Sequence, residues 1–415
     1  MEAHAAIEAV FREESGRILA TLIRISGSFD RAEEAMQDAL ASALAVWPSK
    51  GIPHNPAAWI TAVAHRRLID HGRRDKTRRE KQDLLRHESA AAPSEPAAEE
   101  DLMHVPDDRL RLIFTCCHPA LNLQAQVALT LRTLGGLTTP QIAKAFLEPE
   151  ATVAQRIVRA KRKIQEARIP YEVPAPEALP ERLWSVCAVI YLIFNEGYAA
   201  ASGQELTRDD LSSEAIRLAR VLCQLAPEPE NCGLLALMLL HDSRRAARVH
   251  AGRLVTLEDQ DRALWDAEKI AEGLRLLESF NLESAGPYQL QAAIAAVHAQ
   301  AEVASQTDWR RIAALYEKLL ALTPSPVIAL NHAVAVAMTD GFEHGLKLIE
   351  GLAASGALDD YHLLHAARAD ILRRMRRLEA AAESYRKALT LATNQVERDF
   401  LQARLEEIRT SSEEH

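Results

Sequence analysis

The stretch GGLTTPQIAKAFLEPEATVAQRIVRAKRKI, residues 135–164, has the pattern of two short helices joined by a turn. Thr139 is placed to cap a first helix that begins at Pro140. LEPEA then makes the turn. Thr152 is placed to cap the second helix, with Gln155 three residues later as its capping-box partner. The stretch therefore predicts a helix-turn-helix.

The second helix of this pair has two different faces. Its apolar positions recur at spacings of three and four residues and should form one buried stripe. They are Val153, Ile157, Ala160 and Ile164. The opposite side carries Gln155, Arg156, Arg159, Arg162 and Lys163. The second helix of such a pair reads the major groove of DNA, where arginine contacts guanine and phosphate. A basic face alone is most often a solvated surface, but the capped turn and the buried stripe make it a prediction of DNA binding.

These basic residues stand out because the chain as a whole is acidic. It has 415 residues, of which 49 are Lys or Arg and 58 are Asp or Glu, for a formal net charge of −9. Residues 51–86 contain nine basic and four acidic side chains, whereas residues 87–108 contain seven acidic side chains and no Lys or Arg. Two basic patches on either side of an acidic spacer indicate a protein that contacts a polyanion at two points.

Length and composition indicate an all-α protein of two to four domains. The abundance of alanine and leucine favours helix over strand. The first residues lack the basic-then-apolar pattern of a signal peptide, and no apolar window is long enough to span a membrane. The five cysteines form no spaced framework, which fits a protein of the reducing cytoplasm.

Proline, glycine and capping residues divide the chain into helical segments. Residues 5–46 are expected to be helical, with a restart at which Asp30 is the N-cap and Glu33 its capping-box partner. Asn55 is expected to cap a further helix that has Pro56 at its first position. The breaks are the stretches 47–56, 88–106 and 169–180. The second break is typical of a flexible acidic linker, and the third, with four prolines, of a semi-rigid tether.

The C-terminal part contains a weak internal repeat. LYEKLLAL (315–322) and SYRKALTL (384–391) are alike, and KLIEGLAA (347–354) lies between them. A period near 34 residues is that of tetratricopeptide helix pairs, which bury a continuous core by stacking. The alternative is a generic helical bundle, because the repeat is degenerate.

At this point the sequence resembles a known family. TVAQRIVRAKRKI resembles region 4 of the extracytoplasmic-function (ECF) class of sigma-70 transcription factors, RAEEAMQDALASAL resembles their region 2.2, and NPAAWITAVAHRRLIDHGRRDKTR resembles their regions 2.3 and 2.4. The resemblance covers residues 5–170 in the right order. The C-terminal half resembles the helical, tetratricopeptide-like extension of one ECF subgroup.

The resemblance implies a role for each matching residue. Those that match the helix bound by the β′ clamp of RNA polymerase are Glu33, Glu34, Gln37 and Asp38. Those in the loop and helix that open the promoter −10 element are His54, Asn55, Trp59, His65, Arg66, Arg67, Asp70, Arg73 and Arg74. The candidate −35 contacts are Thr152, Gln155, Arg156, Arg159, Arg162 and Lys163. The chain departs from the family at Ala154, a position that is often basic, so its preferred −35 sequence stays open.

The resemblance and the breaks together predict six parts. They are sigma region 2 (1–86), an acidic linker (87–106), the region 4 helix-turn-helix (107–170), a proline-rich tether (171–180), a helical middle domain (181–283) and tetratricopeptide-like repeats (284–410). We expect an alternative sigma factor that is not an enzyme and needs no cofactor or metal. Its implied partners are core RNA polymerase, through the β′ clamp and β flap, and promoter DNA. We expect no membrane association, and we expect the C-terminal part to regulate the factor in cis or to bind a protein or peptide partner.

Two other functions stay open at this point. One is a helix-turn-helix regulator whose helical half senses a ligand or peptide, and the other is a tetratricopeptide scaffold whose basic segments are incidental.

Three other stretches could carry chemistry. Cys116, Cys117 and His118 could suggest a metal site, but adjacent cysteines chelate poorly and packing at a helix end is favoured. HDSRRAARVH (241–250) is interpreted as surface charge. YLIFNEGYAAASG (191–203) is interpreted as a packed helix end rather than as the lining of a pocket.

Overall fold

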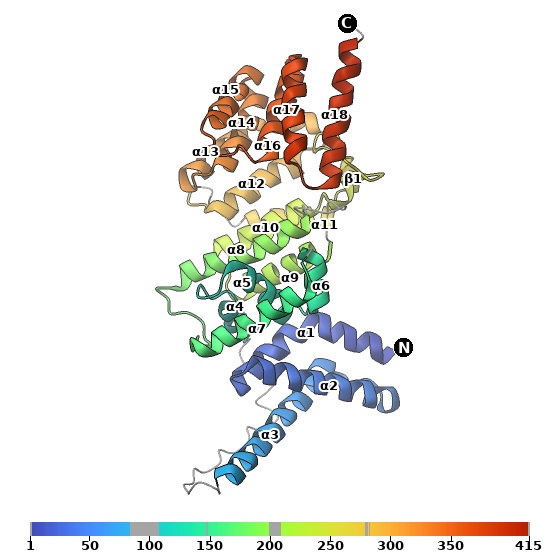
Figure 1. The fold of residues 1–415 in the computed structure, drawn as a ribbon, viewed down its shortest axis with the longest axis vertical. Helices are drawn as coiled ribbons and strands as arrows, with labels where there is room; N and C mark the ends of the chain where they lie inside the picture. Colours follow the sequence, from blue (N-terminus) through green and yellow to red (C-terminus); the bar gives the residue numbers. More distant parts are fainter. Residues whose placement is uncertain are drawn as a thin grey trace. The chain divides into compact units, whose positions relative to one another are not determined.

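The computed structural model describes residues 2–83, 108–146, 148–198, 209–278, 281 and 283–413. These residues are almost entirely helical (Figure 1), which confirms the all-α class. They form two compact units, Met1–Val189 and Ile190–His415. The division falls inside a helix and not in the expected proline-rich tether. The finer six-part division stays a prediction.

The first three helices pack against one another. They are α1 (Glu2–Ser26), α2 (Phe29–Lys50) and α3 (Pro56–Asp83). The N-cap of α2 is Ser28, whose hydroxyl accepts from the Arg31 backbone N–H at 3.4 Å. The prediction that Asp30 is this cap is therefore wrong, and Asp30 lies in the first turn of α2. The Asn55 cap is confirmed, because its Oδ1 accepts from the Ala58 backbone N–H at 3.0 Å.

Four short helices follow. They are α4 (Arg109–Cys116), α5 (Leu123–Thr133), α6 (Thr139–Phe146) and α7 (Glu150–Glu166), so the predicted pair of helices is present as α6 and α7. Their caps differ from the prediction. Thr138, not Thr139, precedes α6 and exchanges hydrogen bonds with Gln141. Helix α7 begins after Pro149, and Thr152 lies within its first turn rather than at its cap.

Both groups of helices belong to the first unit and are joined by polar contacts. The carboxylate of Asp108 has no exposed surface and accepts from Arg24 of α1 and Arg111 of α4, each at 2.8 Å. The hydroxyl of Tyr171, in the proline-rich stretch, donates to the Ala20 carbonyl of α1 at 2.9 Å. Removing an ion pair's partner from a buried carboxylate is costly, so Asp108 fixes α1 against α4.

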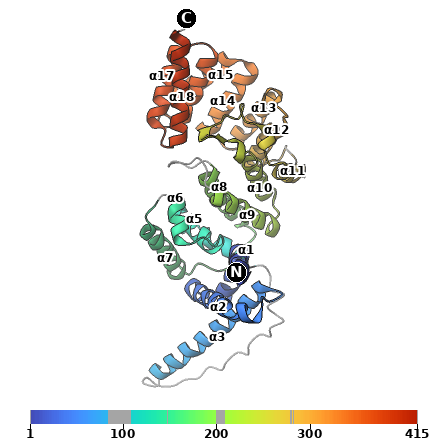
Figure 2. The ribbon, with the colours of Figure 1, turned by 90° about the vertical axis from the view of Figure 1, so that its right-hand side faces the viewer.

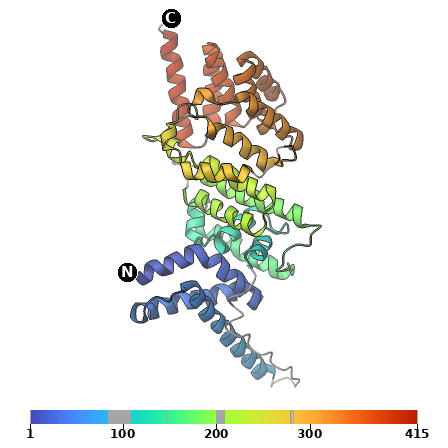
Figure 3. The same ribbon diagram turned by 180° about the vertical axis from the view of Figure 1, so that it is seen from behind.

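Helix α8 (Leu179–Tyr198) spans the division between the units. In the second unit, α9 (Asp209–Leu225), α11 (Ala267–Glu278) and α12 (Pro287–Gln300) all contact α10 (Pro229–Asp242) (Figure 3). Most residues of α10 are buried.

A feature between α10 and α11 was not expected. The strands β1 (Val249–His250) and β2 (Arg253–Leu254) form an antiparallel hairpin, the only sheet among the described residues. Its turn contains Ala251 and Gly252, both at positive φ (49° and 76°). Two such residues are what a tight two-residue hairpin turn requires. Short 3₁₀ turns flank it: η2 (Arg245–Ala247) and η3 (Arg262–Leu264).

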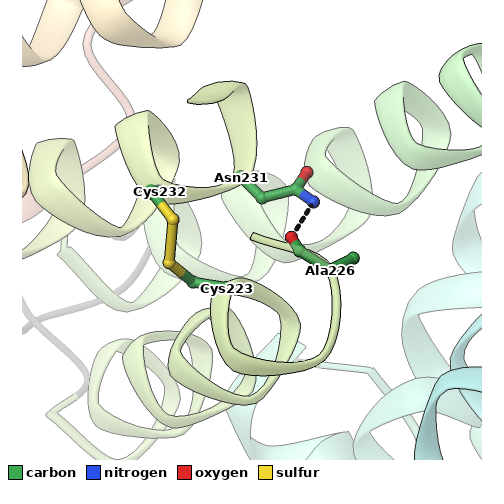
Figure 4. The surroundings of a disulfide bond; sticks show 4 residues. All are labelled: Cys223, Ala226, Asn231 and Cys232. Atoms are coloured by element: carbon green, nitrogen blue, oxygen red, sulfur yellow. Dashed lines mark hydrogen bonds between the residues drawn. A yellow bond between two sulfur atoms is a disulfide. The ribbon is translucent and has the colours of Figure 1, made fainter. Parts of the chain in front are cut away.

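A disulfide joins the end of α9 to the start of α10 (Figure 4). It links Cys223 to Cys232, whose Cα atoms lie 5.2 Å apart. Beside it, the side-chain amide of Asn231 in the first turn of α10 donates to the Ala226 carbonyl at 2.8 Å. The expectation that the cysteines form no disulfide is therefore wrong for this pair. The interhelical turn brings the two side chains together, and their sequence spacing alone gave no sign of it.

The remaining helices pack in chain order (Figure 2). They are α13 (Trp309–Leu322), α14 (Pro326–Asp340), α15 (Phe342–Ala354), α16 (His362–Arg374), α17 (Leu378–Leu391) and α18 (Gln395–Glu413), with the 3₁₀ turn η4 (Ala304–Gln306) before them. The three similar segments of the sequence fall on alternate helices, α13, α15 and α17. Helices α14 and α15 approach closely, because a Cβ added at Gly345 would lie 2.3 Å from that of Ala337.

Candidate nucleic-acid interface

Helix α7 separates its apolar and basic residues as the sequence predicted. Val153, Ile157, Ala160 and Ile164 are all buried. Gln155, Arg159, Arg162 and Lys163 are all exposed, as is Thr152. Burial of the stripe fixes the rotation of the helix, so the exposed set forms one continuous polar and basic face.

Arg156 is held differently from its neighbours on this face. Its guanidinium contacts the Glu148 carboxylate at 2.8 Å, and its side chain is only 20% exposed. Glu148 belongs to the turn before α7, so this pair ties the helix to the turn. Arg162 pairs with Glu166 at 2.8 Å, but both of these side chains are well exposed and the pair is of the weak surface type.

The exposed face of α7 borders a hollow of about 330 Å³. Its other wall is the start of α5, with Asn122 and Gln124, so two amide side chains lie beside Gln155, Arg159 and Lys163. Sequence reasoning did not select these two residues. The available signal was Asn122, whose side chain caps α5 by accepting from the Ala125 backbone N–H at 2.8 Å.

Lys161 lies on the side of α7 that faces α2. Its ammonium contacts Glu33 at 2.8 Å and Asp30 at 3.1 Å, and its side chain is 11% exposed. It is therefore the one member of the basic run RIVRAKRK that is buried, and it brings the helix-turn-helix against the predicted polymerase-binding helix. Sequence reasoning missed this contact because its partners are about 130 residues away.

The predicted polymerase-binding residues lie on two consecutive turns of α2. Glu34 and Gln37 are exposed and Asp38 is half-buried, while Glu33 faces Lys161. The structure thus leaves three of the four residues accessible and engages the fourth within the chain.

The predicted −10 residues lie before and along α3. His54, Asn55, Arg66, Arg67 and Asp70 are exposed, while Trp59 and His65 are partly buried. Arg73 and Arg74 lie on the same helix, and their side chains are outside the described part of the structure.

Two aromatic side chains of this helix are packed. The Trp59 ring lies edge-on to the buried Trp47 ring, with centroids 5.5 Å apart. Trp59 therefore anchors α3 to α2 and presents only part of its surface to solvent. Burial, and then the charge of Arg24, lower the pKa of His65, which favours its neutral form at pH 7.

The cysteine and histidine stretches have structural roles. Burial raises the pKa of the Cys117 thiol to about 12 and that of Cys116 further, and each thiol lies against a threonine hydroxyl of α5. No group of three or more His, Cys, Asp or Glu side chains that could hold a metal occurs among the described residues.

The interpretation of HDSRRAARVH as surface charge is wrong for His241. Its ring packs edge-on to that of Tyr198, with centroids 5.4 Å apart, and burial, followed by the charges of Arg244 and Arg248, lowers its pKa to about 3. His250 is exposed. The helix end YLIFNEGY, by contrast, is packed as expected, with the Tyr191 ring against that of Tyr288.

Comparison with known proteins gives matches to three families. Residues 10–79 match sigma-70 region 2, residues 111–164 match sigma-70 region 4, and residues 182–281 match a family of unknown function. No solved structure matches significantly.

Two relatives differ in how much of the chain they cover. An uncharacterized protein of Rhizobium meliloti (strain 1021) is 44% identical over 395 residues, which are 94% of this chain and 93% of the relative. A probable ECF RNA polymerase sigma factor, SigI of Mycobacterium tuberculosis, is 29% identical over 177 residues. That match covers 42% of this chain and 59% of the relative.

No helix in the described part of the chain is long and apolar enough to cross a membrane. The two sigma regions occur in the family's order, and their helices carry the exposed residues described above. The chain belongs to the ECF type of the sigma-70 family of transcription factors.

Proposed function

We propose that the chain binds core RNA polymerase and directs it to a defined set of promoters. Helix α2 would contact the β′ clamp, the helix-turn-helix would contact the β flap and read the −35 element, and α3 would open the −10 element. The observation that carries this proposal is the exposed basic face of α7, opposite a stripe that is fully buried. A protein helix with this arrangement is suited to the major groove.

The second DNA contact is supported by the exposed residues of α3. Opening a duplex costs about 1–2 kcal/mol of stacking per base step. Arg66 and Arg67 offer positive charge along which a separated strand can run, and His54 and Asn55 are exposed in the turn that precedes the helix.

The contact between Lys161 and Glu33 has a consequence for polymerase binding. If Glu33 contacts the clamp, as the family implies, its pair with Lys161 must open first. The closed pair would then represent the free factor, and binding of polymerase would release α7 from α2.

The test is transcription by purified core polymerase together with this chain, at promoters found by mapping its binding sites on genomic DNA. Replacing Arg156 and Arg159 by Ala should abolish initiation without loss of folding. Replacing the exposed Arg310 and Arg311 by Ala removes the same charge from the second unit and should leave initiation intact.

A separate measurement distinguishes this function from its rivals. Binding to core polymerase should be lost when Glu34 and Asp38 are replaced by Ala. DNA binding that needs no polymerase, and is unaffected by these changes, would instead favour a helix-turn-helix regulator. Full activity of the Arg156 and Arg159 variant would favour a scaffold.

We further propose that the second unit binds a partner that controls the factor. Support comes from the alternate placing of the similar segments on α13, α15 and α17, which is the arrangement of tetratricopeptide-like arrays. Such arrays bind extended ligands on their concave side.

A further inference from the structure

A groove of about 850 Å³ lies among the C-terminal helices. Its lining comes from each of the helices α12 to α18, from η4 and from the segment that follows β2. Val334, Met338 and Ile371 make part of its lining apolar. Its size and mixed lining suit an organic ligand rather than a lone ion.

Two arginines in this groove are each held by a neighbouring carboxylate and an aromatic ring. Arg374 of α16 donates its Nε–H to Asp370 of the same helix at 2.7 Å, and its guanidinium lies 6.0 Å from the Phe342 ring centroid. Arg404 of α18 pairs with Glu407 at 2.8 Å and lies 5.2 Å from the Phe400 ring centroid. Each guanidinium is therefore oriented before any ligand arrives.

The free edges of both arginines point to one acidic segment of the chain itself. Arg374 donates to Glu258 at 2.5 Å, and Arg404 lies 3.8 Å from the carboxylate of Asp259. Leu257, the residue before this acidic pair, also lines the groove. Glu258 and Asp259 are 54% and 61% exposed, so both pairs are of the weak surface type and can exchange with another carboxylate.

We propose that this groove binds an acidic peptide segment of a partner protein. Two adjacent carboxylates of the peptide take the places of Glu258 and Asp259 on Arg374 and Arg404, and its apolar side chains lie on the groove wall beside them. The segment that follows β2 is then an internal competitor. This inference rests on the proposed partner-binding role of the second unit, and it specifies that the partner presents an acidic peptide segment.

The apolar part of the groove favours a peptide over a small anion. A small anion would satisfy the two guanidiniums but would leave the lining around Val334 and Met338 uncovered. The chain's own segment already combines an apolar residue with two acidic ones, which is the pattern the groove accommodates.

The probe for the test is a fluorescein-labelled peptide with the sequence of residues 254–261, LVTLEDQD, and its neutral counterpart is LVTLQNQN. Fluorescence anisotropy is measured on the full chain, without polymerase or DNA, so the result does not depend on sigma activity. In the Glu258→Gln, Asp259→Asn variant the tethered competitor is weakened. This variant should bind the acidic probe about tenfold more tightly than the unchanged chain does.

Further variants identify the arginines as the binding groups. Adding Arg374→Gln and Arg404→Gln to the previous variant should abolish binding of the acidic probe. Adding Arg310→Gln and Arg311→Gln, which remove the same charge from exposed positions on α13, should leave it unchanged. Circular dichroism of each variant establishes that it is folded, and Arg374→Lys provides a milder change that should retain part of the affinity.

Two results would overturn the proposal. One is equal binding of the acidic and neutral probes by the Glu258→Gln, Asp259→Asn variant, which would make the acidic segment a structural latch only. The other is displacement of the acidic probe by citrate, but not by chloride at the same ionic strength, together with a probe affinity to which the leucine side chains contribute nothing. That outcome would make the groove a small-anion site.

Discussion

The basic run of α7 and the stretch HDSRRAARVH look alike in the sequence, yet their side chains are used in opposite ways. On α7, Arg159 and Lys163 extend into solvent opposite a buried stripe. In the other stretch, Arg245 pairs with the buried Asp242, and Arg248 stacks 3.8 Å from the Tyr198 ring centroid. The first arrangement leaves cations free for a ligand, whereas the second uses them to hold the fold.

The difference teaches that the number of cations in a run does not reveal their role. What distinguishes the two runs is the apolar residues between the charges. Those of α7 recur at helical spacing and so define a buried face. The apolar residues of HDSRRAARVH lie in a 3₁₀ turn and a strand, and its cations contact Asp242 of the same stretch and aromatic rings of other segments.

The largest expected effect follows from Asp242. Its carboxylate is 1% exposed and pairs with Arg245 and, at 3.1 Å, with Lys269. Asp242→Ala leaves two cations without this partner, and we expect it to lower the free energy of unfolding by about 3 kcal/mol. Urea denaturation followed by tryptophan fluorescence measures this change. Asp360→Ala, at an exposed position, is the control. Equal effects of the two variants would contradict the claim that the cations of HDSRRAARVH hold the fold.

A pH dependence tests the same region. Burial, with nearby arginines, lowers the pKa of His241 to about 3 and that of His298 to about 4. An unfolded histidine has a pKa of about 6.5, so below that pH the unfolded chain binds protons that the folded unit does not. The free energy of unfolding should therefore fall as pH falls from about 6.5 towards 4, by up to about 2 kcal/mol per histidine at pH 5.

Two histidine variants isolate this effect. His241→Gln should make stability between pH 7 and pH 5 less dependent on pH by about one proton. His250→Gln, at an exposed position of the same stretch, should leave the dependence as it is. If the slope of stability against pH were unchanged in the His241 variant, a group other than His241 would cause the pH dependence.

The converse test concerns DNA affinity. Arg159→Ala should weaken promoter binding about tenfold, as expected for loss of an arginine contact worth roughly 1–3 kcal/mol. Its thermal midpoint should be unaltered, because Arg159 is exposed. Arg245→Ala should instead lower the thermal midpoint and leave promoter binding unaltered. Filter binding measures the DNA affinity of both variants, and thermal unfolding measures their stability. If both variants lost the same property, the two runs would not differ in role.

A smaller effect is expected at Lys161, the member of the α7 run that behaves like the other stretch. Lys161→Met removes the partner of Glu33 and should raise the affinity for core polymerase roughly fivefold, which corresponds to about 1 kcal/mol. Lys163→Met changes an exposed neighbour in the same way and should leave that affinity unaltered. Surface plasmon resonance with immobilised core polymerase measures both, and a decrease for Lys161→Met would contradict the proposal.

The smallest effect should come from Arg162. Its pair with Glu166 is exposed on both sides, so Arg162→Ala should change the free energy of unfolding by less than about 0.5 kcal/mol. If Arg162 contacts a phosphate, the same variant should reduce the salt dependence of DNA binding by about one ion. Titrations at several salt concentrations report this slope.

The helices were predictable from the sequence because their apolar spacing is a local property. Their starts were less so. Asp30, Thr139 and Thr152 were expected to be caps, yet α2, α6 and α7 begin at neighbouring positions. A neighbouring Ser28 or Thr138 takes the capping role at α2 and α6, whereas α7 starts after Pro149 without a side-chain cap.

Contacts between different helices could not be predicted from local patterns. The Lys161–Glu33 pair, the Cys223–Cys232 bond and the packing of His241 all depend on how helices are placed. The exposed basic face of α7 depends only on the local apolar stripe, so its exposure could be predicted from the sequence. The groove, which is lined by residues of α12 to α18, had no local signature in the sequence.

The position of Lys161 limits how this factor can be re-engineered. Exchanging α7 for the recognition helix of another sigma factor would be the obvious way to give it new promoters. Gln155 and Arg159 are free to change in such a chimera, since they contact solvent. Lys161 is not, because a graft that lacks it would leave Glu33 and Asp30 without their cation. If α7 reads the promoter and Glu33 binds polymerase, as proposed above, then one helix influences both functions, and a swapped helix would change both.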